Sequence, residues 1–401
     1  MVLLIFNFID LQFTHKITTK EYHYIIGGAG LAGLTLAYKM MKNGLLEQKQ
    51  LVIIDADTKI KNDRTWSFWT KNIQQLTDFP VIQEWPRGII KTENRVLEQS
   101  LHPYKYYSIE GLAYYEFIKE ALAQCKQVTW LVSSITSEVL ESKQIITTAG
   151  ALSYTDYYFK GHFNAKEVVD PNKVKATNFM WQHFLGWKIK VDKAIFDPKA
   201  ITYMDMRIPQ PKNGLAFVYI LPENGTQALV EYTLFSGVLL DKEEYEHTLS
   251  TYLSESLGLS SYQIELEEYN KIPMTTLLGN SASGSCIPIG TLAGAVKAST
   301  GYSFVRNQQH TDEIITALAK NARPPGYKVS KRHFLYDKVL LDVIGGGSAS
   351  GESVFTNLYH KNKLPSLLKF LDEKTTLWEE IKIMNSVPKW IFIKSVLRNL
   401  F

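Results

Sequence analysis

Three glycines near the start of the chain, Gly28, Gly30 and Gly33, have the spacing of a phosphate-binding turn. They follow the apolar run Tyr24–Ile26, open a helical run, and precede Asp55 by about 20 residues. In this order, glycines let the backbone approach a pyrophosphate, the helix N-terminus faces its negative charge, and the acid binds a ribose hydroxyl. We therefore expect a bound dinucleotide. Its contacts would come from Gly28, Ala29, Gly30, Leu31, Ala32, Gly33 and Asp55.

The alternative is a turn that serves only close packing between a strand and a helix. Such packing would explain Gly33 but would not require glycine at both Gly28 and Gly30. A second glycine-rich segment, 290–303, again precedes a helical run, and we expect it to contact the nucleotide through Gly290, Thr300, Gly301 and Tyr302. A third glycine cluster, 345–351, follows a helix rather than a strand, which indicates a helix stop and a loop.

Composition narrows the class of protein. With 401 residues, the chain is long enough for two or three domains of ordinary size. Its 44 basic and 40 acidic residues leave a net charge of +4, which is too balanced for a dedicated nucleic-acid-binding protein. Cys125 and Cys286 lack the spacing of a zinc site or a redox couple, so we expect two buried thiols, a reducing compartment and no metal.

The positions of apolar residues divide the chain into an α/β part, a strand-rich part and a helical end. The expected strands are 24–26, 51–54, 89–97, 128–132, 145–148, 187–191, 200–206, 215–219, 228–233 and 264–272. The expected helices are 111–124, 242–257 and 308–322, with further helices beyond Pro325. The close spacing of strands between Phe179 and Thr233 indicates an antiparallel sheet.

The apolar stretch Met1–Phe13 has neither a basic leading region nor a cleavage site, and it contains Asp10. It is shorter than the roughly 20 residues of a membrane-spanning helix. We expect an accessory, surface-seeking extension, and any membrane contact of the chain to be peripheral.

Several stretches, taken in their order, resemble the flavoprotein lycopene beta-cyclases of bacteria and plants. They are the glycine turn, Arg64–Phe68, Gln182–Trp187, Phe196–Pro198, Met204–Arg207, Leu229–Thr233, Pro288–Gly290 and Ser299–Ser303. The resemblance implies an α/β fold: a Rossmann-type, p-hydroxybenzoate-hydroxylase-like FAD-binding domain, a mostly antiparallel substrate domain and a helical C-terminal part. The implied boundaries are 20–85, 100–175 and 265–325 for the FAD-binding domain, 86–99 and 176–264 for the substrate domain, and 326–401 for the helical region.

The resemblance also implies an isomerase, or intramolecular lyase, that performs no net oxidation. A proton is added to the terminal double bond of linear lycopene, the cation closes into a six-membered beta-ionone ring, and a neighbouring proton leaves, giving gamma-carotene or beta-carotene. Glu231 takes the first acidic position of the family motif before Thr233, and Tyr232 stands at the second. Glu231 is therefore the implied acid or base, and we expect burial to raise its pKa. An exposed strand residue paired with a lysine is the alternative.

The implied cofactor is FAD in its reduced form, which would stabilise the cation; NAD(P)H would serve only as its reductant. Thr291 stands where many relatives of the fold place an aspartate on the ribityl chain, so backbone amides must do more of that binding. Aromatic faces also stabilise positive charge, so Trp66 and Phe68 are candidates for lining the substrate site, with core packing as the alternative. Asp205 and Arg207 share one face of a strand and either form an ion pair or line the site.

The C-terminal segment 388–401 is typical of an interfacial helix, although packing on the protein's own core would give the same pattern. Its apolar positions are Trp390, Ile393, Leu397 and Leu400, and its basic positions are Lys389, Lys394 and Arg398. Because lycopene or a related linear carotenoid must be drawn from a bilayer, we expect a cytoplasmic protein attached peripherally to a membrane surface. A flavin-dependent monooxygenase or prenyl reductase, or a non-catalytic lipid-binding protein, remains as an alternative.

Overall fold

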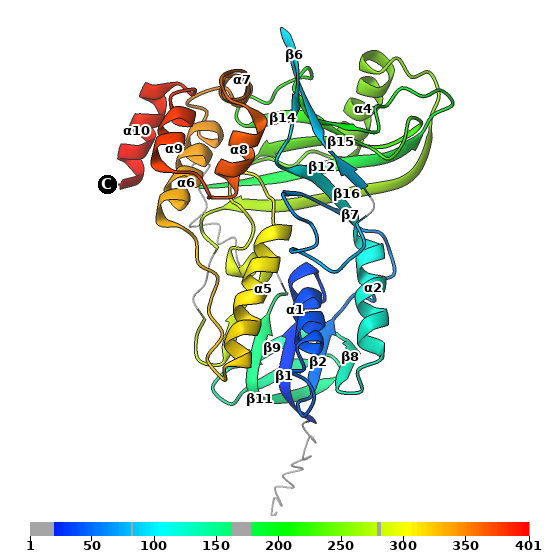
Figure 1. The fold of residues 1–401 in the computed structure, drawn as a ribbon, viewed down its shortest axis with the longest axis vertical. Coiled ribbons are helices and arrows are strands. Elements are labelled where there is room, and N and C mark those ends of the chain that lie inside the picture. The colour runs from blue at the N-terminus through cyan, green and yellow to red at the C-terminus, as the bar shows by residue number, and fades with distance from the viewer. Residues whose placement is uncertain (1–19, 82, 163–177, 279–281, 401) are drawn as a thin grey trace, which may run out of the picture.

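Two large sheets lie at opposite ends of the molecule, and a group of C-terminal helices covers the second sheet (Figure 1). The computed structural model describes residues 20–81, 83–162, 178–278 and 282–400. The apolar stretch Met1–Phe13, expected to be an accessory extension, lies outside the described residues.

The first sheet belongs to the α/β part and has the strand order β8-β2-β1-β11-β10-β9, with β17 paired to β11. Its strands are β1 (Lys20–Gly27), β2 (Leu51–Asp55), β8 (Val128–Val132), β9 (Ile135–Val139), β10 (Gln144–Thr147), β11 (Gly150–Lys160) and β17 (Cys286–Pro288). Strands β8, β2, β1, β11 and β17 run parallel. The first four residues of β2 are fully buried, as in a parallel sheet that helices cover.

Three helices share an apolar core with this sheet: α1 (Leu31–Lys42), α2 (Gly111–Ala123) and α5 (Phe304–Ala319). The β1–α1–β2 unit confirms the strand–turn–helix–strand order read from the glycine spacing. The helices expected at 111–124 and 308–322 are also confirmed, the second with an earlier start.

The second sheet has the strand order β16-β12-β15-β14-β13-β5-β6. Its strands are β5 (Arg87–Thr92), β6 (Arg95–Ser100), β12 (Phe179–Lys190), β13 (Ala200–Asp205), β14 (Leu215–Pro222), β15 (Gln227–Ser236) and β16 (Gln263–Thr275). All neighbours are antiparallel except β13 and β5. The domain boundary expected at residue 265 runs through β16, which pairs with β12 along its length.

The two faces of β15 pack against different parts of the protein. Leu229 and Phe235 belong to a core shared with the C-terminal helices. The side chain of Tyr232 points to the opposite face, where it packs against Tyr245 of helix α4 (Lys242–Thr251). This alternation decides which side chains of the family motif can meet.

A small sheet lies between the two large ones, with the order β3-β7-β4 (Figure 1). Its strands are β3 (Thr65–Thr70), β4 (Gln83–Trp85) and β7 (Lys105–Glu110). The aromatic run after Asp55 therefore forms a strand next to both parts of the molecule.

Five helices end the chain: α6 (Lys331–Gly345), α7 (Gly351–Lys361), α8 (Leu364–Leu371), α9 (Leu377–Met384) and α10 (Lys389–Leu400). Helix α6 stops at the third glycine cluster, where Gly347 has a φ of +68°. A Cβ on Gly351 would lie 2.1 Å from the carbonyl oxygen of Gly214. These glycines therefore end a helix and permit close packing, which confirms the expected helix stop.

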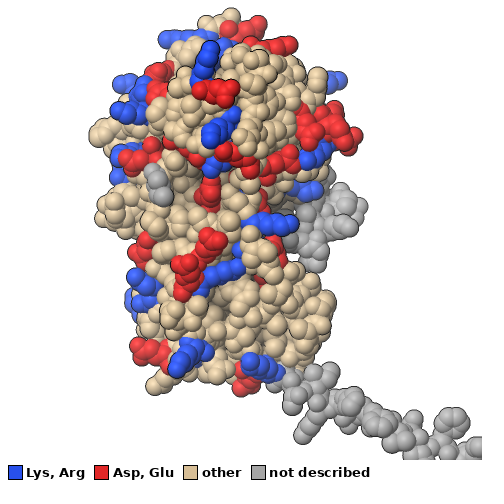
Figure 2. Space-filling model, turned by 90° about the vertical axis from the view of Figure 1, so that its right-hand side faces the viewer, with Lys and Arg blue, Asp and Glu red and all other residues tan. Residues whose placement is uncertain are grey.

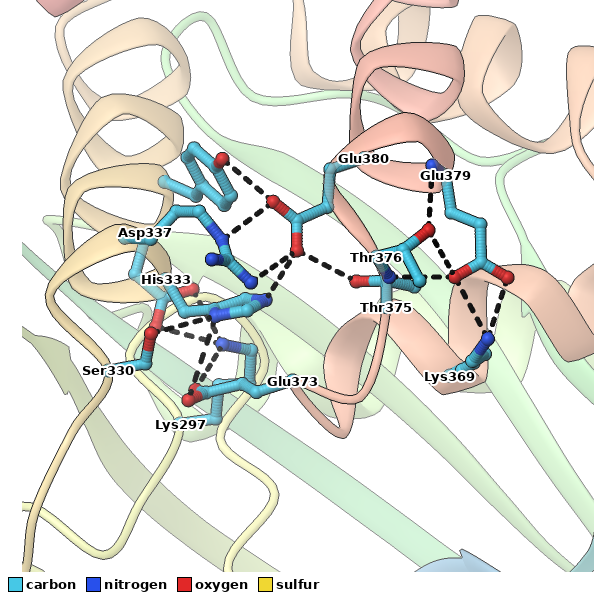
Figure 3. A network of polar contacts seen from close by, with 12 residues as sticks. Lys297, Ser330, His333, Asp337, Lys369, Glu373, Thr375, Thr376, Glu379 and Glu380 are labelled. Carbon is cyan, nitrogen blue, oxygen red and sulfur yellow. Dashed lines mark hydrogen bonds and ion pairs between the residues drawn. The ribbon is translucent and has the colours of Figure 1, made fainter.

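A buried polar network joins the second glycine-rich segment to these helices (Figure 3). The Lys297 ammonium lies 3.0 Å from Asp337 of α6 and 3.2 Å from Glu373 in the loop after α8. Glu380 of α9 lies 2.8 Å from Arg332 of α6. Because breaking a buried pair leaves an uncompensated charge, the network fixes the helices against the glycine-rich segment.

Lys and Arg are interspersed with Asp and Glu on the face shown in Figure 2, with no large patch of one sign. Among the described residues, none of the helices has the length and apolar character needed to cross a membrane.

Candidate active site

The turn between β1 and α1 forms a cradle in which each glycine has a different constraint. Gly28 has a φ of +101°, which glycine adopts at no steric cost. A Cβ on Gly33 would lie 2.1 Å from the carbonyl oxygen of Gly28, so close strand–helix packing explains this glycine. A Cβ on Gly30 would instead meet no atom within 4 Å and would project into open space. Packing alone therefore does not account for Gly30, whereas the approach of a ligand to the backbone does.

Asp55 closes the cradle from the end of β2. Its Oδ2 accepts a hydrogen bond of 2.6 Å from the amide of Ala29, and its Oδ1 accepts one of 2.8 Å from the amide of Asp57. The Lys59 ammonium lies 3.7 Å from Oδ2. The carboxylate thus holds the glycine turn in place at the position where the spacing predicts a ribose contact.

The second glycine-rich segment faces this cradle. Gly290 has a φ of +66°, and a Cβ there would lie 3.1 Å from the Cβ of Ala32 in α1. Gly301 has a φ of +74°, and a Cβ would lie 2.0 Å from Oε1 of Gln182. Oε1 of Gln182, Oγ1 of Thr300 and Oδ1 of Asn307 are buried without a hydrogen-bond partner among the described residues. Because buried polar atoms are normally satisfied, these three suit a polar ligand in the space they line.

One cavity of about 1000 Å³ extends from the cradle to the C-terminal helices. At the cradle end it is lined by Gly28, Gly30, Asp55, Thr300, Gly301 and Tyr302. Its other end is largely apolar, with Met204, Phe217, Tyr219, Phe235, Phe355, Leu367, Phe370, Ile383, Phe392 and Val396. A volume of this size suits a large ligand or two ligands side by side.

Glu231 lies in the wall of this cavity, on the inner face of β15. Its side chain is only 9% exposed, and its Oε1 accepts a hydrogen bond of 2.6 Å from Oγ1 of Thr233. Burial raises the pKa of Glu231 to about 8; Thr233 lowers it, and the charge of Glu268 adds to the rise. This rise favours the protonated form near neutral pH, from which the carboxyl can donate a proton into an apolar space.

The neighbouring position, Tyr232, faces α4 on the other side of the sheet. An acid at this position would not share the cavity with Glu231, because adjacent residues of a strand point to opposite faces. The departure from the family motif at Tyr232 thus removes no carboxyl from the cavity.

A second buried carboxyl, which no sequence motif indicated, comes from β16. Glu268 is 1% exposed and accepts hydrogen bonds from the amide of Thr65 at 2.9 Å and from its Oγ1 at 2.5 Å. Burial raises the pKa of Glu268 to about 7, while Thr65 lowers it. Its position within a long strand of polar residues gave no local signal.

Asp205 and Arg207 form an ion pair with an Nη2–Oδ2 distance of 2.8 Å, and neither lines the cavity. Asp205 is fully buried and also accepts a hydrogen bond of 2.7 Å from Tyr252. Burial acts to raise the pKa of Asp205, but Arg207 and Tyr252 bring it below the ordinary value. Of the two alternatives offered for Asp205 and Arg207, the structure shows the ion pair.

Of the two candidate aromatics, Trp66 lines the cavity and Phe68 does not. Phe68 stacks on Phe304 of α5 at 4.2 Å between ring centroids, so it is a core residue. In the part of the chain that the structure describes, His, Cys, Asp and Glu side chains form no group of three or more that could hold a metal ion.

The fold is that of the p-hydroxybenzoate-hydroxylase-like, FAD-dependent oxidoreductases and halogenases. A geranylgeranyl bacteriochlorophyll reductase-like protein from Thermoplasma acidophilum aligns with a TM-score of 0.64 and 12% identity over 96% of this chain and 100% of its own. A probable FAD-dependent monooxygenase from Pseudomonas aeruginosa aligns with a TM-score of 0.55 and 11% identity over 82% of this chain and 98% of its own.

The chain belongs to the lycopene cyclase protein family, whose profile matches residues 24–398. It is 28% identical over 297 residues to a lycopene beta-cyclase of Pseudescherichia vulneris, covering 70% of each chain. It is 25% identical over 301 residues to a lycopene beta-cyclase of Pantoea ananas, covering 71% of each chain.

Proposed function

We propose that this protein is a lycopene beta-cyclase, in which Glu231 donates the proton that starts ring closure. Membership of the lycopene cyclase family supports carotenoid cyclisation as the reaction class. The observation that carries the proposal is the position of Glu231: a buried carboxyl with a raised pKa in the wall of a cavity that also reaches Gly30 and Asp55.

The proton step follows from the surroundings of Glu231. The acid transfers its proton to the terminal double bond of the polyene, and the resulting cation closes to a six-membered ring. The carboxylate left behind can take up the proton released from the ring carbon, so protons and electrons balance over the cycle. Desolvation keeps the proton on Glu231 until substrate binds, because it destabilises the carboxylate relative to the acid; the same effect makes Glu231 a weaker acid.

Aromatic side chains around Glu231 can stabilise the carbocation that forms after proton transfer. Tyr219 lies opposite Glu231 on β14, and Phe217 and Phe235 meet edge to face at 5.4 Å. Their ring faces carry negative potential, which stabilises a cation without reacting with it. Their bulk also keeps water, which would otherwise capture the cation, away from the substrate.

FAD fits the cradle end of the cavity, where the glycine turn, Asp55 and the second glycine-rich segment meet. Gly30 leaves room for a pyrophosphate, and the unpartnered oxygens of Gln182, Thr300 and Asn307 suit the polar edge of a flavin. When bound in its reduced, anionic form, FAD would supply negative charge near the cation without transferring electrons. NAD(P)H enters this scheme only as a reductant for the flavin.

Helices α9 and α10 suit a peripheral contact with a membrane. Trp378 of α9 is 82% exposed and Trp390 of α10 is 78% exposed, and Ile393 of α10 lines the cavity while remaining half exposed. The opposite side of α10 packs inward, where the buried Ser395 hydrogen-bonds Asp342 of α6. A surface of exposed tryptophans beside the apolar end of the cavity suits the entry of a substrate from lipid.

Expression in a lycopene-accumulating cell, followed by mass and absorption analysis of the pigments, tests the proposal. We expect ringed carotenoids with the mass of lycopene, and unchanged lycopene with Glu231→Gln. The matched control Glu267→Gln, which alters an exposed acid on the opposite face of β16, should remain active. Products with added hydrogen or oxygen would instead identify a reductase or a monooxygenase, and unaltered lycopene with the unmodified protein would contradict the proposal.

A further inference from the structure

Glu231 and Glu268 lie in one row across three neighbouring strands. Glu231 of β15 is paired with Gly186 of β12, and Gly186 is paired on its other side with Glu268 of β16. Directly opposite residues share a face of the sheet, so both carboxyls lie on the same face, on which Glu231 lines the cavity. Two strand spacings separate the rows of Cβ atoms by about 10 Å.

The residue of β12 between the two acids is Gly186, and the side chains of Glu231 and Leu229 pack closely over it. A Cβ at this position would lie 3.4 Å from both Cβ and Cγ of Glu231 and 3.2 Å from Leu229. No side chain of β12 therefore stands between the carboxyls in this row. The two carboxyls therefore interact electrostatically across a buried region, where water and salt screen their charges poorly.

The hydrogen bonds of Glu268 are those of a carboxylate. Each of its two oxygens accepts a bond from a donor of Thr65, Oε2 from the amide and Oε1 from the hydroxyl. On protonation the Thr65 hydroxyl would have to turn from donor to acceptor, whereas the carboxylate accepts from both donors as they stand. The site thus provides for the ionised form of Glu268, while Glu231 has one hydroxyl donor, Thr233.

Other charges near Glu268 come from the small sheet. The negative charges of Asp63 and Glu110 add to the effect of burial, which raises the pKa of Glu268. The Arg64 guanidinium interacts favourably with Glu268 and pairs with Asp63. On the side of Glu231, the titratable neighbours are Tyr219 and Glu268 itself.

We propose that Glu268 is a positioning residue, which ionises before Glu231 and then holds Glu231 in the protonated form from the other end of the row. The inference rests on the proposed function of Glu231 as proton donor. It gives Glu231 a carboxyl partner on β16, on the face of the sheet opposite to that of Tyr232. Two carboxyls whose surroundings divide them into an acid and a charged partner are a recurring device of proton-transferring enzymes.

The test is the pH dependence of cyclisation by the holoenzyme with Glu268→Gln. Loss of the negative charge should move the alkaline limb of the profile to lower pH by about one unit. Glu268→Asp, which keeps the charge, should restore much of the original profile. The control Glu267→Gln should leave the profile unchanged.

Two further measurements distinguish an effect on the pKa of Glu231 from misfolding of the variant and from failure of the proposed function. Thr65→Val removes the hydroxyl donor that favours the carboxylate of Glu268, so it should move the limb in the same direction. Infrared difference spectra of the Glu231 carboxyl band, assigned with Glu231→Gln, should show the same shift without requiring turnover. An unchanged profile and band with Glu268→Gln would overturn the inference while leaving Glu231 as the donor. Full activity of Glu231→Gln would overturn the proposed function itself.

Discussion

Thr233 donates a hydrogen bond of 2.6 Å to Glu231 from two residues further along the same face of β15. Burial raises the pKa of Glu231 to about 8, and this bond opposes the rise because it stabilises the carboxylate. The acid strength of Glu231 is thus lowered by burial and by the charge of Glu268 and raised by the hydroxyl of Thr233.

Replacing that hydroxyl should weaken the acid. In Thr233→Val the pKa of Glu231 should rise by about one unit, because a hydrogen bond to a charged group contributes about 1.5 to 3 kcal/mol. The alkaline limb of the pH–rate profile should move upward, and the rate at neutral pH should fall severalfold to tenfold. Thr233→Ser keeps the donor and should behave like the unmodified protein; an unshifted profile for Thr233→Val would contradict the account.

The raised pKa of Glu231 also affects stability. Between its ordinary pKa of 4.5 and the folded value of about 8, the folded state holds a proton that the unfolded state has lost. The free energy of unfolding therefore falls as pH rises through this window. Glu231→Gln removes this loss, so the variant should be more stable than the unmodified protein by a few kcal/mol above pH 8 and nearly equal to it near pH 4.5. Thermal unfolding across this range measures the difference, and a parallel dependence for both proteins would argue against a buried carboxyl.

The glycine turn offers a matched pair of substitutions. A Cβ at Gly30 meets no protein atom within 4 Å, so Gly30→Ala should fold normally and weaken FAD binding by about tenfold or more. A Cβ at Gly33 would collide with the backbone of Gly28, so Gly33→Ala should lose about 1 to 3 kcal/mol of stability. Flavin titration and thermal unfolding separate the two effects. Unimpaired flavin binding by Gly30→Ala would place the cofactor elsewhere.

The exposed tryptophans of α9 and α10 should contribute to lipid binding. Trp378→Ser and Trp390→Ser should each weaken sedimentation with anionic phospholipid vesicles by about tenfold, because each removes a large apolar side chain from the contact. Ile60→Ser, in the loop after β2, alters a residue that is 68% exposed in the α/β part and serves as the control. Equal binding by all three variants would contradict this assignment of the membrane surface.

Local spacing made the glycine turn between β1 and α1 predictable. The glycine turn, Asp55 and the second helix start are each defined within a few residues of sequence, so their order alone indicated a β–α–β unit. Glu231 became the candidate acid through the short motif that carries the family resemblance. Its apolar neighbours on the strand predicted that it is buried, which the structure confirms. The third glycine cluster was correctly assigned to a helix stop because it follows a helix.

Relationships that depend on strand register were not predictable. Glu268 and Glu231 are aligned in one row only because β15, β12 and β16 pair in this register. Sequence alone does not reveal which residues of three strands lie opposite one another. For the same reason, nothing in the aromatic run distinguished Trp66, which lines the cavity, from Phe68, which stacks on α5. The exposed face of α9 likewise depends on how the C-terminal helices pack.

The most direct test of proton donation by Glu231 is cyclisation of lycopene in D2O by the purified protein with reduced FAD. Because the carboxyl proton exchanges with solvent before substrate binds, each ring formed should carry one deuterium, and Glu231→Gln should form no rings. Rings without deuterium, or labelled rings formed by Glu231→Gln, would contradict the account.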